Sequence, residues 1–397
     1  MEKIIEILFF AWLVVFPFGQ LAVIPGSLLF GLPEVHILLI DLLTMLIGIV
    51  WFVWRLSERK KRLVLPVLGK PLLAFLLFAG LSLVLNAGHY KMSEVMVSSF
   101  YFLRLAAYFL LYFALSDLKQ KVFTRDKVVG FLTIVGLMSA IFGLVQYFLW
   151  PDITFLQTFG WDQHYYRALG TFFDPGFLGI ILVLTLVLLS FGQDKNKKGF
   201  FFYLAVLLVF LCLMLTYSRS SYLALIGGLL WFAAQKKKLV YILIGLAILS
   251  LAIIALPRKS GGEGVHLERV QSTIARFGNW QQSVFYARQS PVFGIGYNTL
   301  RYFQKNTGVL TKGWDMTRSG AGVDSSLLFV LVTTGLFGFG AYLWLWISSF
   351  RAAMRLNGRW KGIVLGSFIA LIIHSFFQNS LFYPWVLGWW VAILALV

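Results

Sequence analysis

Three arginines occupy conspicuous positions in this otherwise apolar chain. Arg167 lies between two apolar runs in RALGTFFDPG, Arg219 lies in the turn TYSRSS, and Arg276 lies in a longer polar segment. A guanidinium group donates two parallel hydrogen bonds and stays charged, which suits it to a diphosphate. If the three side chains converge, they form a cradle for such a group. The open alternative is that Arg167 and Arg219 extend to the membrane interface and that Arg276 is solvent-exposed.

Asp324 is the main candidate for accepting a proton. It ends the long polar segment and begins an apolar run, in GAGVDSSLLF. Partial burial would raise the pKa of its carboxyl from about 3.9 toward a range that is useful for a general base. The alternative is that Asp324 and Ser325 only cap the following helix. His164 and His266 are further candidates for proton transfer.

The sequence predicts neither a metal site nor a cofactor. None of the five histidines has another histidine four residues away, and Cys212 is the only cysteine. The chain therefore lacks a histidine pair of this spacing and a cysteine cluster, and it can form no internal disulfide. The glycine turn GIGYN is too weak a motif to indicate a nucleotide site.

Several polar residues have a structural interpretation. Asp41 and Arg104 lie at similar depth in two predicted helices, and the favoured interpretation is a structural ion pair. Asp174, in FFDPG, is a natural helix N-cap with Pro175 as the first helical residue. His374 lies inside an apolar run and is interpreted as a core histidine.

The composition predicts an all-α polytopic membrane protein, with residues 1–397 forming one integral membrane domain. Of its 397 residues, 59% are hydrophobic and 13% are charged, whereas soluble domains contain about 25% charged residues. The net charge of +18 does not indicate nucleic acid binding, because the basic residues are dispersed in short clusters between apolar runs. A spanning helix needs about 20 mostly apolar residues. About twelve spans are predicted, at 4–25, 35–55, 66–86, 95–116, 127–150, 173–192, 200–217, 219–235, 239–256, 323–349, 362–379 and 381–397.

The basic clusters also predict the orientation of the chain. They fall on alternate turns, at 55–62, 116–127, 193–198, 235–238 and 351–361. The positive-inside rule assigns these turns, and with them both termini, to the cytoplasm. The opposite side then carries a medium loop at 151–172 and a long basic loop at 257–322. Apolar residues with helical spacing in the long loop predict amphipathic helices that lie on the membrane.

The order of these motifs resembles the O-antigen ligase and O-antigen polymerase superfamily. RALGTFFDPGFLG is followed by TYSRSSYLALIGG, then by RFGNWQQSVFYARQSPVFGIGYNTL in the long loop, and then by DSSLLFVLVTTGLFGFG. The resemblance covers most of the chain and is clearest from about 165 to 345.

This resemblance implies a metal-independent, inverting glycosyltransferase with a GT-C-like fold in the bacterial inner membrane. It implies transfer of a glycan from undecaprenyl diphosphate to an acceptor, which is lipid A core, a growing polymer or a protein, at the outer face. It also implies that Arg167, Arg219 and Arg276 contact the diphosphate. Ligases of the family usually carry a histidine where this chain has Asp324. That departure favours a polymerase or a divergent transferase.

Two functions from other classes remain open. A transporter would carry its polar groups near the bilayer midplane in two related halves, whereas the unusual charges here gather near one face. A non-enzymatic binder of lipid-linked glycans would need the arginines but not Asp324.

Overall fold

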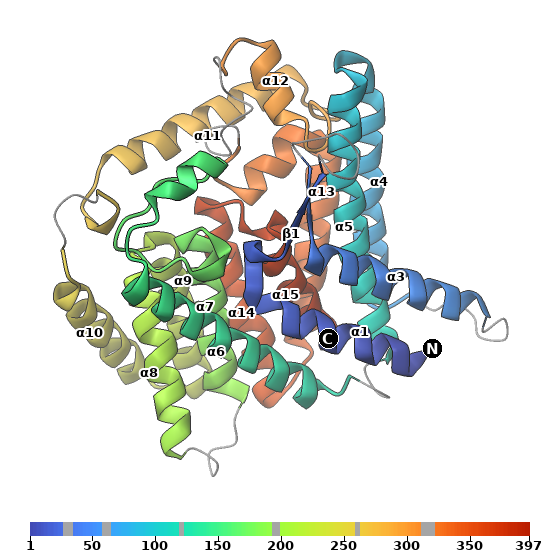
Figure 1. The fold of residues 1–397 in the computed structure, drawn as a ribbon. Helices are drawn as coiled ribbons and strands as arrows, with labels where there is room; N and C mark the ends of the chain where they lie inside the picture. Colours follow the sequence, from blue (N-terminus) through green and yellow to red (C-terminus); the bar gives the residue numbers. More distant parts are fainter. Residues whose placement is uncertain (27–34, 58–64, 119–122, 193–198, 259–262, 311–321) are drawn as a thin grey trace.

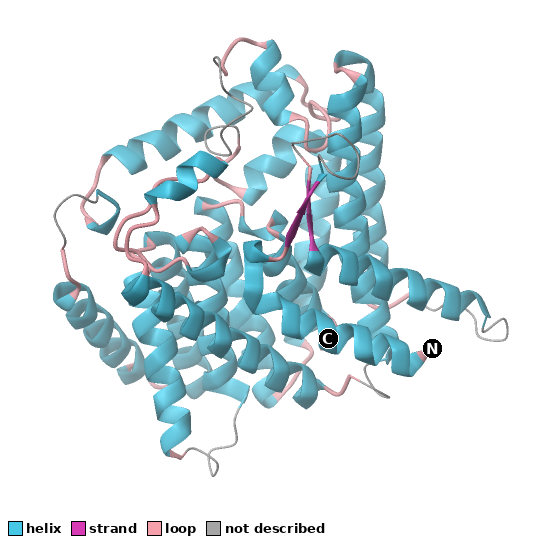
Figure 2. Ribbon diagram, in the orientation of Figure 1, coloured by secondary structure: helices cyan, strands magenta, loops and turns pink. Residues whose placement is uncertain are grey.

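The computed structural model describes residues 1–26, 35–57, 65–118, 123–192, 199–258, 263–310 and 322–397. Within these residues the fold is a helical bundle (Figures 1 and 2), and the prediction of an all-α polytopic membrane protein is confirmed. The described residues also contain one antiparallel pair of short strands, β1 (Val23–Pro25) and β2 (His36–Leu38). Residues 259–262 and 311–321 of the predicted long loop, and 58–62, 119–122 and 193–198 of the basic clusters, lie outside the described residues.

Each of the twelve predicted spans contains a helix. The helices are α1 (Glu2–Val15), α3 (Leu39–Ser57), α4 (Gly69–Asn86), α5 (Met92–Leu118), α6 (Arg125–Leu149), α7 (Pro175–Gly192), α8 (Phe200–Leu215), α9 (Arg219–Lys236), α10 (Val240–Ala255), α13 (Ser326–Met354), α14 (Gly358–Phe377) and α15 (Pro384–Leu394). Among the described residues, eight segments are long and apolar enough to cross a membrane, whereas α8, α10 and α15 are apolar but shorter.

The C-terminal segment differs from the prediction of a span at 381–397. Helix α15 has only 11 residues, and all of them are buried, including Trp385 and Trp389. At a rise of about 1.5 Å per residue, such a helix cannot cross a hydrocarbon core about 30 Å thick. A run buried in protein and a run facing lipid have the same apolar composition, so the sequence alone did not separate them.

The N-terminal span predicted at 4–25 corresponds to the segment Glu2–Leu21, which is long and apolar enough to cross a membrane, but its C-terminal end is irregular. Helix α1 ends at Val15, a 3-10 turn follows at Phe16–Leu21, and the chain then enters β1. Gly19 adopts a φ of +52°, and a Cβ atom there would lie 2.4 Å from the carbonyl oxygen of Thr171. The Thr171 hydroxyl donates a hydrogen bond to the carbonyl of Pro17 over 2.6 Å. The end of α1 therefore unwinds to dock on the segment that leads into α7.

Helix α7 lies at the centre of the part of the bundle that carries the site. Of its 18 residues, 15 are buried, and it packs against α6, α8, α9 and α14. Its approach to α9 is close, because a Cβ atom on Gly179 would lie 2.3 Å from the Ser221 hydroxyl oxygen. This contact fixes the start of α9, where Arg219 is located.

The predicted helices of the long loop are present as α11 (Gln271–Gln289) and α12 (Leu300–Asn306). Figure 1 shows both at one end of the bundle, where α5 also begins, and Lys305 of α12 forms an ion pair of 3.0 Å with Glu94 of α5. The apolar residues of α11 differ in their exposure to solvent or lipid. Tyr286 is buried, whereas Ile274 is 65% exposed and Phe277 is 56% exposed.

A break in α13 anchors this loop to the bundle. Gly335 has a φ of +65°, and a Cβ atom there would lie 2.4 Å from the carbonyl oxygen of Val292. Main-chain hydrogen bonds join Ile295 N to Val332 O over 3.0 Å and Leu336 N to Pro291 O over 2.8 Å. The glycine turn of GIGYN is thus a docking element, which holds the C-terminal end of α11 against α13.

The predicted orientation can be tested by cysteine labelling in intact cells. Asn306 and Asn357 are exposed, and Cys212 is buried. In a Cys212→Ser background, we expect Asn306→Cys to react with an impermeant maleimide and Asn357→Cys to react only after the membrane is permeabilised, since the basic turns should be cytoplasmic. Equal labelling of the two positions before permeabilisation would contradict the topology.

Candidate active site

Arg167 is held by main-chain carbonyls at the end of α8. It lies in the connection between α6 and α7 and is buried, with 8% exposure. Its Nε donates to the carbonyl of Thr216 over 3.0 Å, and its Nη2 donates to that of Tyr217 over 3.4 Å. A Cβ atom on Gly264 would lie 2.8 Å from Arg167 Cδ, so the long loop passes directly over this side chain.

Gln146 of α6 hydrogen-bonds the main chain of the segment that carries Arg167. Its Oε1 accepts hydrogen bonds from the main-chain nitrogens of Leu169 and Gly170 over 3.0 and 3.1 Å. Its Nε2 donates to the carbonyl of Arg167 over 3.3 Å. The carboxamide therefore orients the residues on both sides of Arg167 and acts as a positioning group.

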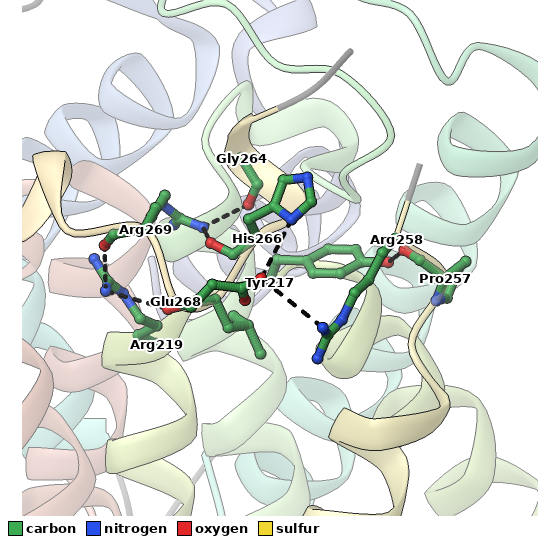
Figure 3. Close-up of polar contacts among 9 residues, drawn as sticks. Tyr217, Arg219, Pro257, Arg258, Gly264, His266, Glu268 and Arg269 are labelled. Atoms are coloured by element: carbon green, nitrogen blue, oxygen red, sulfur yellow. Dashed lines mark hydrogen bonds and ion pairs between the residues drawn. The ribbon is translucent and has the colours of Figure 1, made fainter. Parts of the chain in front are cut away.

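Arg219 is the first residue of α9, directly after the N-cap Ser218. Its guanidinium ties the long loop to the bundle, as Figure 3 shows: Nη1 donates to the carbonyl of Arg269 over 3.1 Å. Its Nη2 donates to the Ser272 hydroxyl over 2.6 Å. The guanidinium therefore bridges the turn before α9 and the segment that leads into α11.

Arg269 joins the predicted arginines, although the sequence analysis did not identify it. Its Nη1 donates to the carbonyls of Gly264 and His266 over 2.6 and 2.9 Å, which folds the loop around it (Figure 3). It precedes Arg276 by seven residues, a spacing that places two side chains on one face of a helix. That spacing could have identified Arg269 from the sequence. In the structure, however, Arg269 lies before α11, which begins at Gln271.

Each of the four arginines lies within electrostatic range of at least two of the others. Burial and then the charge of Arg269 lower the pKa of Arg167 to about 9, Asp174 opposes this, and Arg276 lowers it further. Burial, and then Arg219 and Arg276, lower the pKa of Arg269. Among the described residues, none of the four forms an ion pair with a carboxylate. Within the part of the chain described, Asp174 and Asp324 offset their mutual repulsion only in part, and a bound anion would relieve it further.

Asp324 lies beside this cluster and is not the helix cap. The cap of α13 is Ser325, whose hydroxyl accepts a hydrogen bond from the main-chain nitrogen of Leu328. The main-chain nitrogen of Asp324 donates to Asn279 of α11 over 2.9 Å, while no described residue hydrogen-bonds its carboxylate. Burial raises the pKa of the Asp324 carboxyl, against the lowering influence of Arg276. The half-buried carboxylate is therefore available to a ligand.

Asp174 is the N-cap of α7, as predicted. Its Oδ1 accepts hydrogen bonds from the main-chain nitrogens of Gly176 and Phe177 over 2.7 and 2.8 Å. The same oxygen accepts from Nε2 of Gln378 over 2.8 Å, which joins the start of α7 to the end of α14. Its charge acts on both Arg167 and Asp324, so it forms one wall of the arginine cluster.

Comparison with known families identifies the segment that carries most of this geometry. Residues 204–343 match the family model described as O-antigen ligase. The chain carries an O-antigen ligase domain. The matched segment runs from α8 into α13 and includes Arg219, Arg269, Arg276 and Asp324, whereas Arg167 lies before it. No curated protein matches the chain.

The family match bears out the resemblance found in the sequence. Over residues 204–343, the match supports an O-antigen ligase- or polymerase-like membrane glycosyltransferase activity in general. The motif RALGTFFDPGFLG lies outside the matched residues, but in the structure its arginine and aspartate contact or face the O-antigen ligase domain.

The histidines of the O-antigen ligase domain and its neighbours differ in environment. Burial, and then Arg167 and Arg269, lower the pKa of His164 to about 3, so this imidazole is neutral and weakly basic. The side chain of His266 is 41% exposed, with Nδ1 3.4 Å from a Glu268 carboxylate oxygen. Nε2 of His374 lies 3.2 and 3.3 Å from the hydroxyl oxygens of Ser220 and Ser221. His374 is therefore a core histidine with partners, and it supports the turn that presents Arg219.

Asp41 and Arg104 form the ion pair that the sequence predicted. Arg104 Nη2 lies 2.7 Å from Asp41 Oδ2, and the Tyr108 hydroxyl donates to the same carboxylate over 3.1 Å. The pair is separate from the arginine cluster. No group of three His, Cys, Asp or Glu side chains that could hold a metal ion is found among the described residues.

Proposed function

We propose that the arginine cluster binds the diphosphate of an undecaprenyl-diphosphate-linked glycan and that Asp324 deprotonates the acceptor hydroxyl. The observation that carries the proposal is the convergence of four guanidinium groups, none with a carboxylate partner among the described residues. Such a site favours a ligand with more than one negative charge. The adjacent half-buried carboxylate supplies the second group that the reaction needs.

The proposed reaction is a single displacement at the anomeric carbon of the donor. The acceptor oxygen forms a bond to this carbon while the bond from the carbon to the diphosphate oxygen breaks. The diphosphate leaves with the electron pair, and the guanidinium groups stabilise its developing charge. Asp324 takes the proton from the acceptor hydroxyl. Attack opposite the leaving group inverts the anomeric configuration.

The proposed location is the outer face of the bacterial inner membrane, with both termini in the cytoplasm. The support is the distribution of basic turns in the sequence together with the position of α11 and α12 at one end of the bundle (Figure 1). Because Asp324 stands where ligases usually carry a histidine, we propose a growing polymer as the acceptor in preference to lipid A core.

The proposal is tested with purified full-length protein in phospholipid nanodiscs. Undecaprenyl-diphosphate-linked glycan extracted from the source cells is supplied as both donor and acceptor. We expect lengthened glycan with the anomeric configuration of the new linkage inverted by NMR, and one undecaprenyl diphosphate released for each linkage formed. Donor that remains intact, or that crosses the membrane of proteoliposomes unchanged, would instead support a binder or a transporter.

Transfer should not depend on a divalent metal ion. Four guanidinium groups provide the positive charge that a metal ion otherwise supplies to a leaving diphosphate. We therefore expect the same initial rate of linkage formation in EDTA as in untreated samples. A rate that collapses in EDTA and returns on adding Mg²⁺ or Mn²⁺ would overturn this part of the mechanism.

A further inference from the structure

A cavity separate from the arginine cluster lies between α5, α13 and the turn that follows α14. It has a volume of about 220 Å³, and the residues that matter for its chemistry are Tyr101, Arg104, Tyr297, Asn298, Asn379 and Tyr383. We call it the amide pocket, after its two asparagines. None of these residues belongs to the arginine cluster.

The amide pocket presents polar side-chain groups that no described residue hydrogen-bonds. The Oδ1 atom of Asn379 is buried and has no hydrogen-bond partner among the described residues. No described residue hydrogen-bonds the carboxamide of Asn298, although its main-chain carbonyl accepts from Ser98. A buried polar group without a partner is costly, so such groups mark a place where a ligand or water completes the bonding.

The charge of the amide pocket argues against an anionic ligand. Among the described residues that line the pocket, Arg104 is the one cation, and Asp41 neutralises it at 2.7 Å. Arg104 uses Nη2 for this contact and for the carbonyl of His36, also at 2.7 Å. The arginine cluster, in contrast, has no such carboxylate partner among the described residues. The amide pocket therefore suits a neutral ligand with hydroxyl groups.

Aromatic rings complete the lining of the amide pocket. The ring of Tyr297 is buried in a group of aromatic side chains that includes Phe329 and Phe382. Tyr383 stacks on Phe177 with ring centroids 3.7 Å apart. Carboxamides that bond hydroxyl groups, combined with rings that contact C–H faces, match the two surfaces of a pyranose.

The surroundings of the amide pocket link it to both the lipid-facing surface and the arginine cluster. An apolar groove of about 190 Å³ flanks it, also lined by Tyr101 and Arg104 and otherwise by side chains such as Leu42, Met45 and Leu103. On the other side, the main-chain nitrogen of Phe177 donates to the Asp174 carboxylate. A ligand with an apolar tail and a sugar head would match this sequence of surfaces.

We propose that the amide pocket binds a neutral sugar ring of a lipid-linked glycan, with the aglycone in the flanking apolar groove. This inference rests on the proposed function for the source of the sugar, which is either the acceptor or the donor. Its test measures binding without transfer, so the two proposals can fail independently.

The test uses full-length protein in phospholipid nanodiscs and octyl β-D-glucoside that carries a photoreactive diazirine on the sugar. After irradiation, we expect labelled peptides that contain residues 97–105, 297–299 or 379–387. Unlabelled octyl glucoside should remove this labelling, whereas tetraethylene glycol monooctyl ether, which has the same tail and no sugar, should not. Labelling that is absent, or that the ether removes equally, would overturn the proposal.

Variants separate recognition from folding. Asn379→Leu has a similar volume and removes the buried Oδ1 atom that no described residue hydrogen-bonds. We therefore expect a thermal midpoint that is unchanged or raised. Displaceable labelling should fall at least about tenfold, the effect of losing one well-placed hydrogen bond. Asn298→Gly keeps the backbone conformation at φ +58° and should also reduce labelling. Asn306→Leu, the control, makes the same change as Asn379→Leu at an exposed position and should label normally.

Competition identifies which sugar the pocket takes. If undecaprenyl-diphosphate-linked glycan displaces the probe in an Arg276→Ala variant as well as in the parent protein, the pocket binds acceptor sugar independently of the arginine cluster. If displacement requires Arg276, the pocket binds a sugar of the donor. Both results support the sugar pocket, whereas normal labelling in both the Asn379→Leu and Asn298→Gly variants would contradict it.

Discussion

Asp324→Asn is expected to lower the rate of glycan transfer by about 10²-fold or more, the usual scale for loss of a general base. Asparagine has nearly the same shape but cannot accept a proton at neutral pH. Ser325, not Asp324, caps α13, and the main-chain bond from residue 324 to Asn279 does not depend on the side chain. Binding of the lipid-linked donor should therefore be unchanged, and the loss should appear in kcat.

The stability of this variant provides an internal control. Burial raises the pKa of the Asp324 carboxyl in the folded state above its unfolded value, so ionising this carboxyl at neutral pH destabilises the fold. The protonated Asp324 carboxyl therefore contributes to stability at low pH, and this contribution is lost as the pH rises through the folded pKa. We expect a thermal midpoint for Asp324→Asn equal to or above that of the parent at pH 7. Glu268→Gln, at a 60% exposed carboxylate in the same loop, is the matched control and should retain activity.

The pH dependence of transfer should identify the same group. The rate in the parent protein should fall as the pH drops through the raised pKa of Asp324, because the base becomes protonated. The residual rate of Asp324→Asn should lack this acid limb. A variant that transfers at close to the parental rate, with the same acid limb, would exclude Asp324 as the base and direct attention to His266.

Arg276→Lys is expected to lower kcat/KM by about 10²-fold, the scale for losing one donor to a developing oxyanion. Lysine keeps the positive charge but not the two parallel hydrogen bonds of the guanidinium. No described residue accepts a hydrogen bond from Arg276, so the substitution removes no hydrogen bond within the described part of the chain. The thermal midpoint should stay at the parental value.

Arg219→Lys should have an effect of similar size on transfer and a second effect on structure. Its Nη1 and Nη2 hold the carbonyl of Arg269 and the hydroxyl of Ser272, and one ammonium group cannot reproduce this fork. We therefore expect faster amide hydrogen exchange in the segment before α11 for this variant but not for Arg276→Lys. Arg288→Lys, at an exposed position of α11, is the control for both. Near-normal kcat/KM in both variants would return the two arginines to a purely structural role.

The sequence was informative where charge is rare and uninformative where it is common. Arg167 and Arg219 stand out because apolar residues surround them, and the structure brings both to the same cluster as Arg276. Arg269 was missed because one more basic residue in a basic loop is not conspicuous. Its importance comes from main-chain carbonyls that only the folded loop supplies.

The helices could be predicted from the sequence, but their burial inside the bundle and their end points were less predictable. Every predicted apolar run contains a helix, because a run of that length in lipid must satisfy its own hydrogen bonds. The burial of α15 depends on partners such as Trp12, which a Cβ atom on Gly388 would meet at 2.6 Å. The amide pocket is likewise a tertiary feature, since Asn298 and Asn379 come from segments far apart in the chain. Neither residue is unusual in its local sequence.

The central claim, that the arginine cluster binds a lipid-linked diphosphate, is tested most directly by locating that group. Cryo-EM of the protein in nanodiscs with undecaprenyl diphosphate should show both phosphates within hydrogen-bond distance of the guanidinium groups of Arg219 and Arg276, with Asp324 on the side where the glycan would attach. Density for the diphosphate at Arg104 and the amide pocket instead, with the arginine cluster empty, would contradict the account.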